Sequence, residues 1–375
     1  MSRIPPFRIV LGGWVALATA SGCADGGPRW AVMPDAAPVA RRVADAVLRD
    51  FPKPPPFDWG EGVLMAGMMR AGLAFGEPRY VTFVQSWADH WRKAGLSPVL
   101  EGRPGEKLRG YCGHWGPGFP VVMLYEKTHD SAYREMAEQV ATFIMKKATR
   151  TDDGGLGHWQ DNRQLWVDTL YMACPPLAHL GRLTGRPEYI AEAARQLDIF
   201  ARHCQDETTG LFYHMYDAPK ARRVGTLWCR GNGWVAMSYV ETLAQMDGRS
   251  AEYARLRDAF RRQVAGLLAT QDRASGLWHT VLDRPKSYLE TSGSAMILYA
   301  LVEGDRLGLL ARQDAGLVRR TWAALAAKVD DQGRVTDVSG GTSPGSYEEY
   351  ARKIRGTETW GTGAFLLAAS ILQTP

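Results

Sequence analysis

A repeated helix–turn–helix pattern constrains the fold of this chain more than any other feature. Four segments share an apolar helix end, a polar turn with Gly, Asp or Pro, and a second helix with an early tyrosine. The tyrosines are Tyr80, Tyr133, Tyr189 and Tyr253, at spacings of 53, 56 and 64 residues. A repeat of this period indicates stacked helical hairpins. Each tyrosine is placed to staple its turn.

Helical periodicity extends this repeat to twelve helices in six pairs. The expected ranges are 38–51, 61–75, 78–94, 116–127, 131–147, 165–183, 188–204, 232–247, 251–270, 291–304, 315–328 and 358–372. One helix of each pair is apolar on nearly all sides, as in "GSAMILYAL", and its partner is amphipathic, as in "REMAEQVATF". Strand-like alternation is scarce. We therefore predict an all-α fold, an (α/α)6 barrel of six helical hairpins. An open α-solenoid is the alternative, although it would need polar capping repeats.

The first residues have the pattern of an export signal. Arg3 and Arg8 precede a short apolar stretch at 9–19, and small residues follow up to Cys23. The apolar stretch is too short to span a bilayer. The pattern resembles a bacterial lipoprotein signal in which Cys23 is lipidated, and a plain secretory signal is the alternative. We expect a signal peptide at 1–22, a tether at 23–37 and a single barrel domain at 38–375, anchored in the periplasm, at the outer membrane.

Charge and motif content exclude several functions. The net charge is +5, and no basic block of the kind that follows phosphates is present, so nucleic acid is not an expected partner. The four cysteines after Cys23 match neither a disulfide framework nor a CxxC metal site. No HExxH or Gly-rich phosphate loop occurs, so we expect no metal and no cofactor. The thirteen tryptophans favour a ligand-binding cleft, and we expect a monomer.

Most unusual residues precede the predicted inner helices. The segments are "FDWGEG", "YCGHWGPG", "RQLWVDTLYM", "WCRGNGW", "YLETSGSAM" and "ETWGTGAF". If the inner helices run parallel, these six segments converge at one end of the barrel and form one cleft. The helix N-termini there carry positive partial charge, which suits an anionic ligand.

The segment "LWCRGNGWVAM" suggests a sugar-binding wall. Trp228 and Trp234 offer flat faces for a sugar ring, and Arg230 offers a fork of donors that matches a carboxylate. The alternative is that Trp234 belongs to the core and that Arg230 pairs with an internal acid.

Asp168 and His214 each allow two interpretations. Asp168 is in the first turn of an apolar helix, where it either complements the helix dipole or, in an aromatic cleft, has a raised pKa and acts as general acid and base. His214 in "GLFYHMYD" is either a hydrogen-bond donor to a sugar or a structural histidine.

Six motifs in one order resemble glycoside hydrolase family 105, the unsaturated rhamnogalacturonyl hydrolases, with the unsaturated glucuronyl hydrolases of family 88 as near relatives. They are "WVDTLYM", "TGLFYHMYD", "WCRGNGW", "GLWHTVLDRP", "YLETSGSAM" and "SYEEY" before "GTGAFLLA". The resemblance covers almost all of the chain after the signal, and it implies an (α/α)6 barrel.

The resemblance also implies a reaction and a set of residues. The reaction removes a 4,5-unsaturated uronic acid from the non-reducing end of an acidic oligosaccharide made by a polysaccharide lyase, by hydration of the vinyl ether. By resemblance, Asp168 is the acid and base, His214 contacts the substrate, and Trp228, Arg230 and Trp234 line the uronate subsite. The same segments supply the other expected binding residues, Trp59, His114, Trp166 and Glu290.

One position departs from the family pattern. Many relatives have Asp-His before the Pro-Gly, and that Asp assists the first one, whereas this chain has Gly113 before His114. The departure leaves three outcomes open: altered specificity, a substitute acid such as Glu290 or Asp161, or lost activity. The alternatives to the hydratase reaction are therefore hydrolysis of an intact uronoside by paired carboxylates, and a sugar-binding lipoprotein without catalysis.

Overall fold

The computed structural model describes residues 33, 35–102 and 109–373. The predicted signal peptide, the lipidation site Cys23 and most of the predicted tether lie outside the described residues. The first helix begins at Ala36, two residues before the expected start of the barrel.

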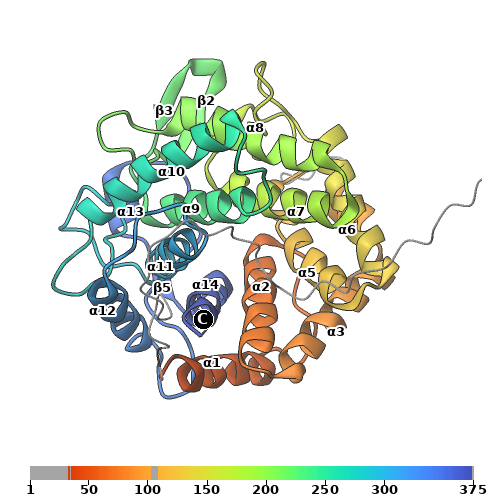
Figure 1. Ribbon diagram of the computed structural model, residues 1–375, viewed down its shortest axis with the longest axis horizontal. Helices are drawn as coiled ribbons and strands as arrows, with labels where there is room; N and C mark the ends of the chain where they lie inside the picture. The colour runs from red at the N-terminus through yellow and green to blue at the C-terminus, as the bar shows by residue number, and fades with distance from the viewer. Residues whose placement is uncertain (1–32, 34, 103–108, 374–375) are drawn as a thin grey trace, which may run out of the picture.

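Two concentric rings of helices form the described part of the chain (Figure 1). The inner ring consists of α2 (Trp59–Ala74), α5 (Gly118–Thr128), α7 (Asp168–Thr184), α9 (Cys229–Leu243), α11 (Thr291–Arg306) and α14 (Thr359–Ile371). The outer ring consists of α1 (Ala36–Asp50), α3 (Pro78–Ala94), α6 (Ser131–Lys146), α8 (Pro187–Cys204), α10 (Ala251–Ala269) and α12 (Ala315–Ala326). Each inner helix packs against the next, and α14 packs against α2. The ring is closed, so the predicted (α/α)6 barrel is confirmed and the open solenoid is wrong.

The closing contact between α2 and α14 depends on two glycines. A Cβ atom on Gly67 would lie 2.5 Å from the carbonyl oxygen of Gly363, and a Cβ atom on Gly363 would overlap the carbonyl oxygen of Val63. Because glycine has no side chain, the two backbones can approach this closely. The first and last inner helices therefore close the ring backbone to backbone.

Three of the repeat's tyrosines connect neighbouring outer helices. Tyr80 on α3 donates a hydrogen bond to Asp45 of α1 at 2.7 Å, and Tyr133 on α6 donates one to Asp89 of α3 at 3.3 Å. Tyr189 on α8 is hydrogen-bonded with Thr142 of α6. Each hydroxyl therefore reaches the preceding outer helix, and the expected staple of the turn stays a prediction.

Shorter elements fill the connections. These are α4 (Ser97–Glu101), α13 (Tyr347–Ala351), the 3-10 helices η1 (Cys112–His114) and η2 (Ala218–Lys220), and five strands. Strands β1 (Gln164–Trp166), β2 (Met215–Asp217) and β3 (Arg222–Val224) form an antiparallel sheet in that order. Strands β4 (Val338–Ser339) and β5 (Arg355–Gly356) form a second antiparallel pair.

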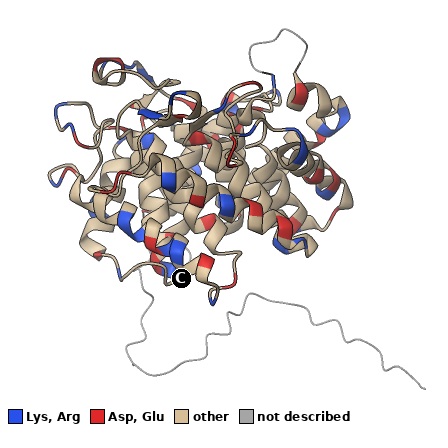
Figure 2. Cartoon of the chain, turned by 90° about the horizontal axis from the view of Figure 1, so that it is seen from above, with Lys and Arg blue, Asp and Glu red and all other residues tan. Residues whose placement is uncertain are grey.

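Positions of Lys and Arg are interspersed with positions of Asp and Glu along the described helices and loops, as Figure 2 shows. Within residues 33, 35–102 and 109–373, no helix has both the length and the apolar character needed to cross a bilayer. The four described cysteines are buried free thiols.

Candidate functional site

A cavity of about 320 Å³ opens at the end of the barrel where the inner helices begin. Its walls come from the segments that precede α2, α5 and α7, from the first turn of α9, and from the loop at 341–343. The predicted convergence on one cleft is confirmed for four of the six segments; "YLETSGSAM" and "ETWGTGAF" supply no lining residue of this cavity. The volume is at the lower end of the range for small-molecule sites.

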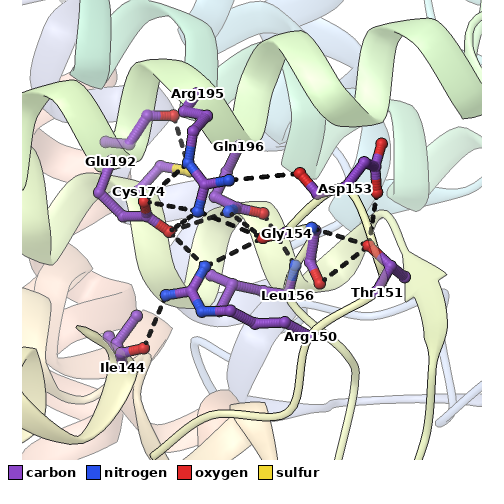
Figure 3. Close-up of polar contacts among 12 residues, drawn as sticks. Ile144, Arg150, Thr151, Asp153, Gly154, Leu156, Cys174, Glu192, Arg195 and Gln196 are labelled. Atoms are coloured by element: carbon purple, nitrogen blue, oxygen red, sulfur yellow. Dashed lines mark hydrogen bonds and ion pairs between the residues drawn. The ribbon is translucent and has the colours of Figure 1, made fainter. Parts of the chain in front are cut away.

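The connection between α6 and α7, which supplies one cavity wall, is anchored to α8 (Figure 3). Arg150 donates hydrogen bonds to Glu192 at 2.6 Å and to the carbonyl of Gly154 at 3.0 Å. The Gln196 side chain donates to the same carbonyl at 3.0 Å and accepts from the amide of Leu156 at 2.9 Å. Glu192 and Gln196 are buried on α8. The loop that carries His158 and Trp159 is therefore held in place by α8.

Aromatic rings form two stacked pairs at the cavity. Trp166 stacks on His158 with ring centroids 4.2 Å apart and an angle of 16°. Trp59 stacks on Trp360 at 4.3 Å. Trp59, Trp166 and His158 line the cavity, so the flat faces that a sugar ring needs are present. They come from α2 and the α6–α7 connection.

Asp168 is the first residue of α7, and its carboxylate faces both the cavity and His214. Its side chain is 19% exposed, and Oδ2 is 3.3 Å from Nε2 of His214. His214 Nδ1 is 2.7 Å from the hydroxyl of Tyr350. An ionised carboxylate only accepts hydrogen bonds, so Nε2 carries the hydrogen and the Tyr350 hydroxyl donates to Nδ1. Tyr350 and His214 together orient Asp168.

His214 itself is fully buried and stacks on Trp228 at 4.2 Å. The structural interpretation of His214 therefore fits the described geometry: the ring is behind Asp168, and it acts on a ligand only through that carboxylate.

The pKa of Asp168 is lowered, not raised as expected for an aromatic cleft. Burial raises the pKa, but the hydrogen bond from His214 and the charge of Arg230 lower it overall. Burial lowers the pKa of His158 to about 3 and also lowers that of His214. Without ligand, Asp168 is therefore ionised and both imidazoles are neutral at neutral pH.

Arg230 organises a loop at the cavity instead of pairing with an acid. One terminal nitrogen of its guanidinium donates to the carbonyl and the hydroxyl of Ser339, both at 2.6 Å, and the other donates to the carbonyl of Gly340 at 3.0 Å. The guanidinium stacks over Trp228 at 4.5 Å. Its Nε is buried and makes no hydrogen bond within the described part of the chain. The predicted fork for a carboxylate is thus largely occupied, and the expected internal acid partner is wrong.

Both tryptophans of "WCRGNGW" are buried, Trp228 at 1% and Trp234 at 0% exposure. Trp234 stacks on Tyr171 at 5.0 Å inside the barrel, so the core interpretation is correct for it. Trp228 covers His214 and Arg230. Neither side chain offers a free face to a sugar, which corrects the predicted sugar-binding wall.

Three further predicted residues lie outside the cavity wall. Glu290 is fully buried and caps α11: it accepts from the amides of Ser292 and Gly293 at 3.1 and 2.6 Å. Asp161 is exposed in the loop, with a left-handed backbone. His114 follows the wall residue Gly113, and its ring packs edge-on against Tyr111. Neither Glu290 nor Asp161 is therefore placed as a substitute acid.

Several residues of the site were not predicted. Asp58, Tyr111, His158 and Trp159 line the cavity, and Tyr350 holds His214. Asp58 and Tyr350 lie within the motifs "FDWGEG" and "SYEEY", so a signal was present for both. His158 and Trp159 lie in an irregular loop with no periodicity to mark them.

No group of three or more His, Cys, Asp or Glu side chains in the described ranges could hold a metal ion.

Comparison with known proteins gives one consistent result. The profile of Glycosyl Hydrolase Family 88 matches residues 36–373. The unsaturated rhamnogalacturonyl hydrolase YesR of Bacillus subtilis is 30% identical over 338 residues, which cover 88% of this chain and 93% of that protein. An unsaturated 3S-rhamnoglycuronyl hydrolase of Formosa agariphila is 30% identical over 337 residues, 84% of each chain.

The fold is also shared with solved structures. A possible member of family 105 from Salmonella enterica superposes with a TM-score of 0.81 at 24% identity, over 94% of this chain and 96% of that one.

Proposed function

Because this chain belongs to glycosyl hydrolase family 88, we propose that it removes a 4,5-unsaturated uronic acid from the non-reducing end of oligosaccharides produced by polysaccharide lyases. The protein is a glycoside hydrolase. The names of two relatives, an unsaturated rhamnogalacturonyl hydrolase and an unsaturated 3S-rhamnoglycuronyl hydrolase, support this substrate class. The same similarity favours an enzyme over a sugar-binding lipoprotein without catalysis.

In the proposed reaction, Asp168 acts first as an acid and then as a base. Its carboxyl group gives a proton to C4 of the unsaturated sugar, and positive charge develops on C5 and the ring oxygen. A water molecule then adds to C5, and the Asp168 carboxylate takes the proton that this water loses. The resulting hemiketal opens, and the bond to the next sugar breaks with release of its hydroxyl. One proton enters and one returns, so Asp168 ends as it began.

The reaction requires Asp168 to hold a proton that it lacks in the free protein. The bound uronate brings a negative charge and excludes water, and both effects favour the neutral acid. Trp166 and Trp59, which both line the cavity, supply the surfaces against which the sugar ring would be held. Helix N-termini around the cavity and the buried Arg230 provide positive potential for the uronate carboxylate.

One observation carries this proposal: the Asp168 carboxylate lines the cavity, and its one ion-pair contact with the described residues is that of Oδ2 with Nε2 of His214, at 3.3 Å. A carboxylate has about four acceptor sites, so the part of this group that faces the cavity stays available to a ligand or a water molecule.

The decisive experiment follows the ultraviolet absorbance of the conjugated double bond while purified protein is mixed with lyase-generated unsaturated disaccharides from pectin, glycosaminoglycan and ulvan-type polymers. We expect loss of absorbance with the wild type and none with Asp168→Asn. A folded wild-type sample that leaves the absorbance of all three unchanged would contradict the proposal.

A second candidate, hydrolysis of an intact uronoside, is favoured by one observation. Asp58 lines the same cavity as Asp168, and paired carboxylates are the usual requirement of that reaction. A saturated glucuronide separates the two candidates: release of its aglycone would support the second, whereas activity only on unsaturated disaccharides would exclude it.

We also propose that the protein is an exported, membrane-anchored monomer of the periplasm. The sequence pattern before Cys23 supports this. Met33 lies beside the last helix, where the side chain of Gln373 donates to its carbonyl at 2.6 Å, so the chain enters the barrel at the end opposite the cavity. Labelling with a radioactive fatty acid should mark the wild type and not Cys23→Ser, and light scattering of the soluble barrel should give one chain per particle.

A further inference from the structure

Two carboxylates face the cavity, and the hydration described above uses only one. Asp58 immediately precedes α2, and its Oδ1 accepts a hydrogen bond from the amide of Trp59 at 2.8 Å. Its side chain is partly exposed and lines the cavity together with Asp168. The helix needs only one oxygen of this side chain, and Asn would cap it as well as Asp. The helix cap therefore does not explain why this side chain is a carboxylate and not an amide.

Gly113 leaves room for the Asp58 carboxylate. A Cβ atom at position 113 would overlap the ring of Tyr111 and would lie 2.9 Å from Oδ1 of Asp58. The space that a side chain at 113 would fill is thus already taken by Tyr111 and by a carboxylate from α2. A glycine here allows a carboxylate to reach the cavity wall from another element.

The charges at the cavity do not balance. Asp58 and Asp168 carry negative charge, and Arg230 is the cation among the described lining residues. Tyr111 and Cys112 stand near both carboxylates: burial raises the pKa of each group most, and the charges of Asp58 and Asp168 add to the effect. A uronate in this cavity adds a further negative charge, and repulsion among the negative charges favours binding of one proton at the occupied site.

We propose that Asp58 is the second carboxylate of the hydration, and that its charge, with that of the bound uronate, retains a proton on Asp168 until Asp168 delivers it to C4. This inference rests on the proposed function. Asp58 acts through Asp168 and has no covalent step of its own.

Other charged and titratable groups also surround the two carboxylates. Glu61, Tyr111 and Cys112 lie near Asp58. His158, His214, Arg230 and Tyr350 lie near Asp168. All of them remain in place when Asp58 alone is changed, so that variant isolates its charge.

The test is Asp58→Asn, which keeps the cap and removes the charge. We expect the alkaline limb of the kcat profile to move to lower pH by about one unit, because neutral Asp168 is then less favoured. At neutral pH kcat should fall about tenfold, and at acidic pH it should return to the wild-type value. The matched control is Asp130→Asn on α6, where Oδ1 also caps a helix, at 2.9 Å from the amide of Ala132. This control should leave the profile unchanged.

The inference would be overturned if the kcat–pH profiles of the wild type and Asp58→Asn coincide and their thermal stabilities are equal. Capping of α2 would then be the whole role of Asp58. An activity-independent arm separates this result from failure of the proposed function. In protein labelled with ¹³C at Asp carboxyl groups, the resonance lost in Asp168→Asn is assigned to Asp168 and titrated. If Asp58→Asn lowers its pKa, the coupling holds even in a preparation without hydratase activity; an unchanged titration would refute it.

Discussion

Both ends of the barrel contain a buried carboxylate beside a histidine, but the two carboxylates have different neighbours. At the far end, Glu241 of α9 lies 2.8 Å from Nε2 of His179, accepts a hydrogen bond from the Tyr299 hydroxyl and lies 3.6 Å from Arg70. At the cavity end, the Asp168 carboxylate lines the cavity, and its ion-pair partner among the described residues is Nε2 of His214, at 3.3 Å from Oδ2. A carboxylate with partners on both oxygens stabilises a structure, whereas one that faces a cavity with a single partner retains the capacity to react.

The ends also differ in their backbone environment. The inner helices begin at the cavity end, where free amide groups favour negative charge, and they finish at the far end, where free carbonyls favour cations. Arg70, Lys127 and Arg306 surround a second cavity of about 400 Å³ at that far end. A carboxylate beside a histidine is therefore proposed to serve chemistry at one end, whereas at the other it connects α9 with α2, α7 and α11.

The largest expected difference concerns activity. Asp168→Asn should lower kcat at least about 10³-fold, because it removes the acid and base of the reaction. The free energy of unfolding should change by no more than about 1 kcal/mol, since Asn fills the same space. Steady-state kinetics and urea unfolding measure the two quantities. Strong destabilisation with retained activity would reverse the assignment of the two ends.

The matching change at the far end should affect stability instead. Glu241→Gln leaves Arg70 and His179 without their anion and should lower the free energy of unfolding by about 3 kcal/mol. The kcat of the folded fraction should remain within about twofold of the wild type. Urea unfolding and kinetics again provide the comparison. Loss of activity in a stable Glu241→Gln protein would place the far end within the functional site.

The pH dependence of stability should sharpen the contrast. Burial raises the pKa of Glu241, but His179, Arg70 and Tyr299 lower it well below its usual range. A lowered pKa gives stability that is present above the unfolded-state pKa and is lost as pH falls through the folded-state value. The stability gap between the wild type and Glu241→Gln should therefore narrow by about 1–2 kcal/mol between about pH 6 and about pH 3. Thermal unfolding at both pH values tests this prediction. A stability difference that does not change with pH would show that it does not arise from ionisation of Glu241.

The smallest effect should come from the hydroxyl that orients His214. Tyr350→Phe removes one hydrogen bond of about 1 kcal/mol, so kcat should fall about fivefold as the imidazole loses its fixed tautomer. Tyr239→Phe is the control, because that buried hydroxyl makes no hydrogen bond within the described structure. Equal kinetics for the two variants would mean that Tyr350 has no part in positioning Asp168.

The barrel could be predicted because the pattern that specifies each helix lies within a short stretch of sequence. Apolar and amphipathic helices alternate at a fixed period, and all twelve expected ranges correspond to helices of the structure. The position of Asp168 at the start of an inner helix followed from the same periodicity.

The environment of the site could not be predicted from the residues next to it in the sequence. The exposure of Trp228 and the partners of Arg230 depend on the loop after Ser339, more than a hundred residues away. The lowered pKa of Asp168 depends on His214, which approaches it only through the sheet of β1 and β2. Likewise, Asp58 becomes a site residue only because α2 and η1 meet beside Gly113.

The glycine contact between α2 and α14 has a consequence for how the chain folds. Residues about three hundred positions apart must meet before the ring is complete, so its closing step has a very high contact order. During synthesis, each of the first five hairpins can pack against its neighbour once both have been made. Until α14 has been synthesised, however, α2 presents an apolar surface to solvent. Such surfaces favour aggregation of incomplete chains. Translation truncated before Thr359 should therefore yield an aggregation-prone, protease-sensitive product rather than a smaller stable barrel.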